Sequence, residues 1–409
     1  MAKHGARSRQ ALASMLDPLV TSGTMFLVQG AVLLTVNKTA FATYSLVYSY
    51  VVMCQAVLSA LFGGPLITLL SGVEGGAREA AGAGALRLQL VIASAVGVAG
   101  LATALAVGLA PHVAVLAVLA MVGLSFRDAL RSVLAVRLEL GKAFGIALWF
   151  AGATTAALGL VWLAMRQVTP EGGLAALAIG ALGTLARQIA RALLTRDRLP
   201  RDILRRMIGM AAWSVPGAAV IWLQNSFYLT LVAVSLSLDA VGEVSAARMI
   251  AMPILIMASG LLRLAQVQAG RKLVEGGLVA AIRNARRLSS FCLAGGALLV
   301  GTCLLAHSTV NRQWLPPAYP HLLSLAGAWL AFAATTTARG FYSSLFQAMG
   351  RYREIFSLNL IVLPFVLSGV VLGPFALGLP GAVLPMAAGE LVLLALLAFR
   401  APRGTTAAT

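Results

Sequence analysis

Charged residues are scarce in this chain, and most soluble functions need more of them. Asp, Glu, Lys and Arg make up 11% of the 409 residues, less than half of the roughly 25% usual in soluble domains. Hydrophobic residues make up 60%. This balance excludes a soluble globular protein and leaves no room for a soluble catalytic domain.

Cysteine and histidine are also rare, which argues against metal or nucleophile chemistry. The three cysteines, Cys54, Cys292 and Cys303, lie in apolar stretches without paired spacing. Such cysteines are typical of small buried hydrophobes rather than disulfides or metal ligands. The four histidines lie at the ends of apolar runs or near the terminus. We therefore expect no catalytic residues, no metal and no cofactor, and not an enzyme.

Long apolar runs are what the chain has in abundance. A membrane-spanning helix needs about 20 mostly apolar residues, and on that basis we predict an all-α integral membrane protein with twelve transmembrane helices. The predicted spans are Leu19 to Val36, Thr43 to Leu70, Leu88 to Ala110, Val113 to Val136, Phe144 to Met165, Leu174 to Leu194, Ile208 to Val234, Gly242 to Gln268, Leu288 to Ala306, His321 to Phe346, Ile355 to Leu372 and Gly381 to Phe399. At the start of the first span, Asp17 and Pro18 are interpreted as a helix N-cap and its following proline.

The positive charge is distributed unevenly between the two sides of these spans. The chain carries 31 Lys and Arg against 13 Asp and Glu, a formal net charge of +18. Nearly all the basic residues fall in alternate connections, while Lys38, Arg166 and Arg312 lie in the others. An excess of this kind holds the basic connections in the cytoplasm. It predicts cytoplasmic termini and requires no nucleic-acid partner.

The chain divides into two related halves. A charged linker around Thr195 to Met207 separates residues 1–200 from residues 201–409, with six spans in each. A shift of 200 positions places Phe41 to Ser45 on Val241 to Ser245, and a shift of 212 places Arg127 on Arg339. Repeats with an even number of spans are related by an axis along the membrane normal, as in many transporters. We expect two pseudo-symmetric six-helix lobes around a central cavity.

Arg248 is the strongest candidate for a cavity residue. It falls about 9 Å inside the outer end of its span, where an arginine in lipid costs about 2.5 to 3.5 kcal/mol. This favours a water-accessible cavity, although Arg248 could also pair with Glu243 or Asp239 near the same helix end.

Three more charged residues lie deep in predicted spans. Arg339 lies 12 residues before Arg351, about 18 Å along a helix, and Arg127 holds the matching place in the first half. Both are candidates for binding substrate, but the helix bearing Arg127 could instead protrude into the cytoplasm. Glu390 in the last span is either protonated, with a role in ion coupling, or paired with a buried arginine.

Uncharged polar residues gather on the opening pair of spans in each half. Tyr44, Tyr48 and Gln55 share one face of the second span, where hydroxyl, amide and ring groups suit a sugar or hydrogen bonding between helices. The further candidates on spans one and seven are Gln29, Gln224, Asn225 and Tyr228.

Short motifs carry a resemblance to a known family. The segment Phe41-Ala42-Thr43-Tyr44-Ser45, its second copy Val241 to Ala247, and Gln347-Ala348-Met349-Gly350-Arg351 resemble segments of the polysaccharide transporter family. This family belongs to the multidrug/oligosaccharidyl-lipid/polysaccharide flippase superfamily. Ala42 and Val244 depart from its usual glycine and tyrosine.

The resemblance implies a flippase of the bacterial inner membrane. It would move a polyprenyl-diphosphate-linked oligosaccharide outward by alternating access for surface or exopolysaccharide assembly, with Arg248 the best match for a cationic cavity residue. Membrane lipids, a polymerase and glycosyltransferases are the expected partners. The alternatives are a multidrug or organic-cation exporter of the same superfamily, which the positive intramembrane charge disfavours, and a membrane glycosyltransferase or polymerase.

Overall fold

The protein is built from long helices. The computed structural model describes residues 2–70, 73, 75–137, 139–194, 199–309 and 319–401, and every regular element in these ranges is helical. The helices are α1 (Ala2–Thr35), α2 (Lys38–Leu70), α3 (Gly75–Ala106), α4 (Pro111–Val136), α5 (Leu140–Met165), α6 (Pro170–Leu194), α7 (Arg201–Asn225), α8 (Tyr228–Ser235), α9 (Leu238–Thr309), α10 (Leu322–Ala348), α11 (Tyr352–Leu377), the short 3₁₀ helix η2 (Leu379–Ala382) and α12 (Leu384–Arg400).

Among the described residues, ten helical segments are long and apolar enough to cross a membrane, two of them within α9. Many large apolar side chains also point away from the protein interior. Leu34, Trp149 and Phe291 are each at least 75% exposed. So many exposed large apolar side chains are unusual in a soluble protein, and lipid is the solvent that suits them. The chain is a multi-pass membrane protein.

Each of the twelve predicted spans corresponds to a helical part of the described residues, although α10 and α12 are not among the ten segments above. Two details of the prediction need correction. The seventh, predicted as one helix from Ile208 to Val234, is wrong in its continuity because α7 ends at Asn225 and α8 begins at Tyr228. Asp17 is not the N-cap of the first helix, because α1 begins at Ala2 and has Pro18 in its interior. The Asp17 carboxylate instead forms an ion pair with Arg131 of α4.

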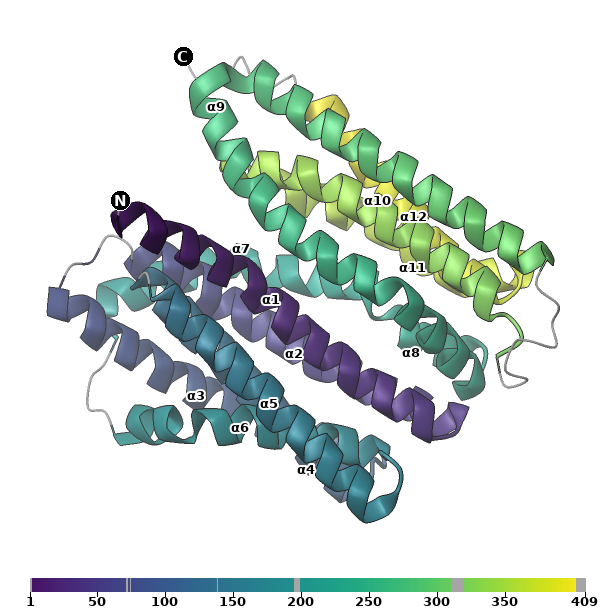
Figure 1. Ribbon diagram of the computed structural model, residues 1–409, viewed down its shortest axis with the longest axis horizontal. Coiled ribbons are helices and arrows are strands. Elements are labelled where there is room, and N and C mark those ends of the chain that lie inside the picture. Colours follow the sequence, from purple (N-terminus) through teal and green to yellow (C-terminus); the bar gives the residue numbers. More distant parts are fainter. Residues whose placement is uncertain are drawn as a thin grey trace. The chain divides into compact units, whose positions relative to one another are not determined.

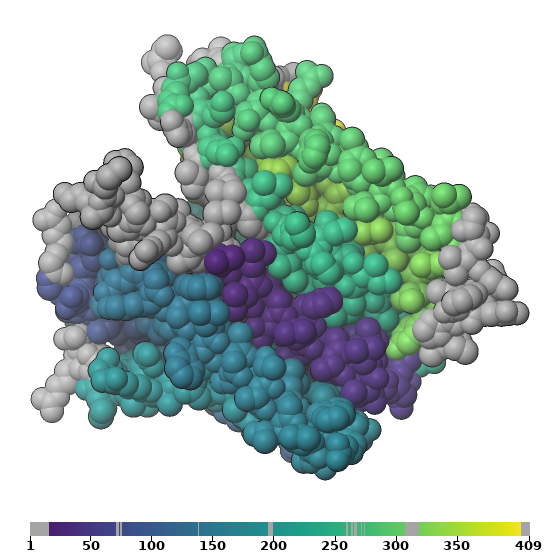
Figure 2. Space-filling model, in the orientation of Figure 1, coloured from purple at the N-terminus to yellow at the C-terminus, as the bar shows by residue number. Residues whose placement is uncertain are grey.

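The chain forms two compact units, and each is described by itself. The N-terminal unit comprises Met1–Trp222 and the C-terminal unit Leu223–Thr409. The boundary between them falls within α7, whereas the division predicted from the charged linker is at residue 200. In the N-terminal unit α7 contributes Ile203 and Met207 to a core with Phe62 and Leu66 of α2. On one face of this unit α1 packs beside α5 (Figure 2).

The C-terminal unit is organised around α10. This helix packs against α9 and α12, and it buries Trp329 and Phe346 completely. The chain of α9 doubles back on itself (Figure 1), and Gly277, with φ 69° and ψ −177°, breaks its helical geometry. The predicted eighth and ninth spans therefore both lie within α9.

Candidate functional site

Arg248 lies on α9 against the ring of Trp329 in the C-terminal unit. Its guanidinium carbon is 5.3 Å from the centre of the indole, and the side chain is half-buried. Its Nε is buried and has no hydrogen-bond partner. A cation over an aromatic face gains about 0.5 to 2 kcal/mol, which offsets part of the cost of removing the guanidinium from water. A bound anion could complete its hydrogen bonding.

Trp329 fixes the surroundings of Arg248. Its indole N–H donates to the carbonyl of Val244 at 3.0 Å, which ties α10 to α9. Tyr228 meets the same indole edge-on, with ring centres 5.2 Å apart. The structure thus brings the predicted residues Tyr228 and Arg248 together around a tryptophan that sequence reasoning did not single out. Glu243, one of the alternative partners of Arg248, instead accepts a hydrogen bond from the backbone N–H of His321 at 2.6 Å.

The two amide residues predicted beside Tyr228, Gln224 and Asn225, lie at the end of α7. Gln224 is buried and donates through Nε2 to the carbonyl of Asn359 on α11 at 2.7 Å. Asn225 is the last residue of α7, and its side-chain oxygen is buried without a hydrogen-bond partner. Gln224 therefore has a structural contact that accounts for it, whereas Asn225 retains an unused acceptor.

Arg339 and Glu390 form a separate charged site in the same unit. The guanidinium Nε of Arg339 on α10 donates to the carboxylate of Glu390 on α12, and its Nη1 lies 3.4 Å from the hydroxyl of Ser343. The two charged side chains are 13% and 4% exposed. This pairing is one of the two arrangements predicted for Glu390, and it neutralises Arg339 as a free cation.

In the N-terminal unit the two predicted tyrosines stack on one another. The rings of Tyr44 and Tyr48 are 5.8 Å apart and inclined by 7°. Tyr44 is 1% exposed, and its hydroxyl has no hydrogen-bond partner. The ring fits against α6 because residue 173 is glycine, where a methyl group would lie 3.1 Å from the tyrosine ring.

The other predicted polar residues of α1 and α2 do not join this stack. Gln55 donates to the Asp128 carboxylate at 2.5 Å, so it belongs to a charged network. Gln29 makes only a long contact, 3.4 Å, to the Met25 carbonyl of its own helix.

That network surrounds Arg127. The Arg127 side chain is 1% exposed, and its guanidinium lies 4.3 Å from the ring centre of Phe150 and 3.3 Å from Asp128. Arg131 lies 3.4 Å from Asp128 and also bonds to Asp17. Arg127 is enclosed by protein, and the alternative that this part of its helix protrudes into the cytoplasm stays a prediction. The pairing of Asp17 with Arg131 was not predicted from the sequence. The presence of one acidic and one basic residue within apolar runs was the signal that could have suggested it.

The protein is similar to known proteins in structure, and no match was found by sequence. No family model matches the sequence, and no curated protein matches it. Solved structures do match. An inward-facing multidrug resistance MATE family transporter of the MOP superfamily aligns over 96% of this chain and 97% of its own, with TM-score 0.66 and 16% identity. An outward-facing form aligns over 96% and 95%, with TM-score 0.67 and 14% identity.

The chain has the MATE-like transporter fold. A eukaryotic MATE transporter matches as well, over 96% of this chain and 94% of its own, with TM-score 0.70 and 13% identity. At these identities the resemblance establishes the two-lobed fold and leaves the substrate open. Assignment to the polysaccharide branch stays a prediction.

Proposed function

We propose that this protein is a membrane transporter that works by alternating access. Solved transporters of the same fold exist in inward-facing and outward-facing forms, and this pair of states is what alternating access requires. The proposal needs no reaction chemistry, only differential binding of substrate to the two states.

The comparisons support the export of small molecules as the first candidate function. Both of these structural neighbours are described as multidrug resistance transporters. We infer that a multidrug-type exporter of this fold is better supported by structural similarity than a polysaccharide flippase.

The charges within the described spans favour an anionic substrate and carry a second candidate. The carboxylate of Glu390 is held by Arg339, and those of Asp17 and Asp128 contact Arg131. An exporter of organic cations needs a carboxylate to receive its substrate. These three already have basic partners, and Glu243, another buried carboxylate in a described span, accepts a hydrogen bond from the backbone N–H of His321. Arg248 is the single observation that favours an anion instead, because its side chain is half-buried and its Nε has no hydrogen-bond partner.

A polyprenyl-diphosphate-linked oligosaccharide fits that requirement. Arginine makes charge-assisted hydrogen bonds to phosphate, and the polyprenyl chain can remain among the lipids. With the cytoplasm negative, outward movement of each negative charge gains about 2.3 kcal/mol per 100 mV. In this form of the proposal the protein lies in the bacterial inner membrane with cytoplasmic termini, and it works beside glycosyltransferases and a polymerase.

Transport by the purified protein in vesicles tests both candidates. The assay compares a fluorescent lipid-linked oligosaccharide diphosphate with a fluorescent organic cation. The exporter candidate predicts that the cation crosses, and the flippase candidate predicts that the anionic lipid crosses and that Arg248→Ala abolishes its movement while membrane insertion stays normal. If the cation crosses and Arg248→Ala leaves its movement unchanged, the exporter reading replaces the flippase reading. If neither compound crosses, the transport proposal is wrong.

Arg166→Ala is the matched control for Arg248→Ala. Arg166 also places its guanidinium over a tryptophan, 5.4 Å from the ring of Trp162, but at the end of α5 in the N-terminal unit. Both variants remove one arginine from one indole. We expect Arg166→Ala to transport like the unmodified protein, and equal losses in the two variants would show that the Arg248 effect is not specific.

A further inference from the structure

A cavity of about 660 Å³, which we call the apolar cavity, lies between α2, α3 and α4 in the N-terminal unit. Its lining comes from residues 46–54 of α2, residues 96–109 at the end of α3 and residues 114–121 of α4. Known small-molecule sites occupy about 300 to 1,000 Å³, so one flexible hydrocarbon chain fits. Among the lining residues that the structure describes, none is charged or carries an amide, and the hydroxyl and thiol groups are those of Tyr50, Thr103 and Cys54.

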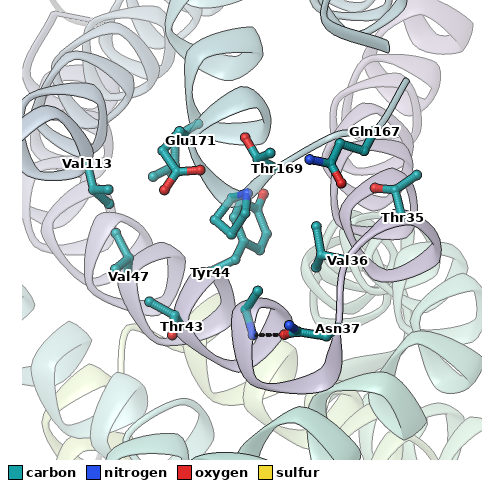
Figure 3. Close-up of a pocket in the computed structure, with 13 residues that line it drawn as sticks. Thr35, Val36, Asn37, Thr43, Tyr44, Val47, Val113, Gln167, Thr169 and Glu171 are labelled. Carbon is teal, nitrogen blue, oxygen red and sulfur yellow. Dashed lines mark hydrogen bonds between the residues drawn. The ribbon is translucent and has the colours of Figure 1, made fainter. Parts of the chain in front are cut away.

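This lining differs from that of the cavity beside Tyr44 in the same unit. The cavity beside Tyr44, of about 440 Å³, is surrounded by threonine hydroxyls and by the side chains of Gln167 and Glu171 (Figure 3). The apolar cavity offers water too few partners, because an ordered water needs about two to four polar groups. The Thr103 hydroxyl already donates to the carbonyl of Ala99 at 2.9 Å. The apolar cavity therefore suits hydrocarbon rather than water.

The walls of the apolar cavity are held by their own packing. The ring of Tyr50 packs against Trp222 of α7, with ring centres 5.6 Å apart. The helices α3 and α4 touch at Gly97, where a methyl group would lie 2.8 Å from Cγ1 of Val118. At Gly100, about one turn further along α3, a methyl group would meet no described atom within 4 Å. The missing side chain leaves open space there, and a space formed in advance loses less entropy on binding.

The apolar cavity is continuous with the surface that faces lipid. Val107 lines the cavity and is also 79% exposed. Large apolar side chains of α3 and α4 near the cavity are exposed as well, namely Val98, Leu105, Val115 and Leu119. Lipid chains therefore reach the opening from the membrane itself. An empty cavity would leave its walls without dispersion contacts, and a hydrocarbon chain restores them.

We propose that the apolar cavity binds one acyl chain of a membrane phospholipid, which enters beside Val107 while its headgroup stays outside. The lining has no charged group to hold the headgroup, so the chain supplies the contacts. Phospholipid is abundant in every membrane, and a ligand in large excess fills even a site of modest affinity. The inference does not depend on which substrate the protein transports.

Photocrosslinking to the full-length protein in detergent tests this site. The probe is a phosphatidylglycerol that carries a diazirine near the methyl end of one acyl chain. We expect saturable labelling of the peptides that contain Cys54 and Thr103, at least tenfold above that of the exposed Trp149 on α5. Excess unlabelled phosphatidylglycerol should abolish this labelling, because one chain occupies the cavity at a time.

Variants that fill the cavity separate a binding site from general contact with lipid. Ala117 and Ala104 line the cavity from α4 and α3, and Ala117→Phe or Ala104→Leu should lower the labelling of Cys54 at least fivefold. Both variants should unfold at the same temperature as the unmodified protein or at a higher one, because the new side chain takes the place of the lipid chain. Ala156→Phe makes the same change at an exposed position on α5 and should be labelled as before.

Three results overturn the acyl-chain site. They are labelling of the cavity peptides no stronger than that of Trp149, undiminished labelling of Cys54 in Ala104→Leu, and displacement of the probe by tetraphenylphosphonium or a polyprenyl phosphate but not by phosphatidylglycerol. The third result would assign the cavity to a transported compound. If Ala117→Phe lowers the unfolding temperature, the smaller change in Ala104→Leu decides by the same criterion.

Discussion

Arg339 and Glu390 form an ion pair between α10 and α12 that is almost completely removed from solvent. The hydroxyl of Ser343 adds a 3.4 Å contact to the guanidinium. Taking two charges out of water is costly, and their mutual attraction repays that cost only while both are present. The pair is therefore more sensitive to the loss of one partner than to the loss of both.

We predict that Glu390→Met destabilises the protein by about 3 to 5 kcal/mol, because it leaves the Arg339 charge buried without a partner. The double variant Arg339→Met with Glu390→Met should recover most of this loss. Thermal unfolding of the three proteins in the same detergent measures the difference. A double variant less stable than Glu390→Met would contradict the argument.

The two arginines of the N-terminal network should respond differently to replacement. Arg131 contacts both Asp17 and Asp128. Arg131→Leu leaves Asp17 without its basic partner, while Asp128 keeps Arg127 and Gln55, and the change should cost at least about 3 kcal/mol. Arg127 has Asp128 as its acidic partner, through Nη2, while its Nε and Nη1 have no hydrogen-bond partner. Arg127→Leu removes these two buried, unpaired N–H groups and should cost less than about 1 kcal/mol. Unfolding temperatures of the two variants check this order, and an equal loss would sink it.

The helices could be predicted from the sequence because their signal is local and repeated. Apolar runs of about 20 residues have few alternatives to a membrane span. The break between α7 and α8 falls at Asn225 and Ser226, which are residue types common in turns. Without a proline or glycine beside them, these two polar residues were a weaker signal than the apolar residues on either side.

The candidate site was predictable residue by residue but not as a set of contacts. Depth in a span marked Arg248, Arg339 and Glu390 as unusual. Their neighbours are distant in sequence: Arg339 and Glu390 are 51 residues apart, and Arg131 and Asp17 are 114 apart. A single sequence contains no information about such pairings beyond opposite charge. For the same reason the lining of the cavity beside Tyr44, drawn from α1, α2, α4, α6 and the α5–α6 connection, could not be assembled from spacing.

Gly180 should be intolerant of any side chain. A methyl group there would overlap the hydroxyl of Thr154 and come within 3.2 Å of its Cα, where α5 and α6 pack. We predict that Gly180→Ala costs about 1 to 3 kcal/mol through overpacking. Gly183→Ala, three residues further along α6, meets no described atom within 4 Å and should be neutral or slightly stabilising. Equal unfolding temperatures for the two variants would contradict the close packing.

Gly277 should be required where the helical geometry of α9 is interrupted. Its backbone, with φ 69° and ψ −177°, lies in a region that only glycine occupies readily, and another residue there costs about 1 to 3 kcal/mol. Gly277→Ala should therefore lower the unfolding temperature although no described atom lies within 4 Å of the new methyl group. Gly270→Ala provides the control within α9, since its surroundings are equally open among the described atoms and it lacks a positive φ. Alanine at position 270 should leave stability unchanged or raise it by up to about 1 kcal/mol. A loss confined to Gly277→Ala would assign the effect to backbone conformation, whereas equal losses would assign it to the side chain.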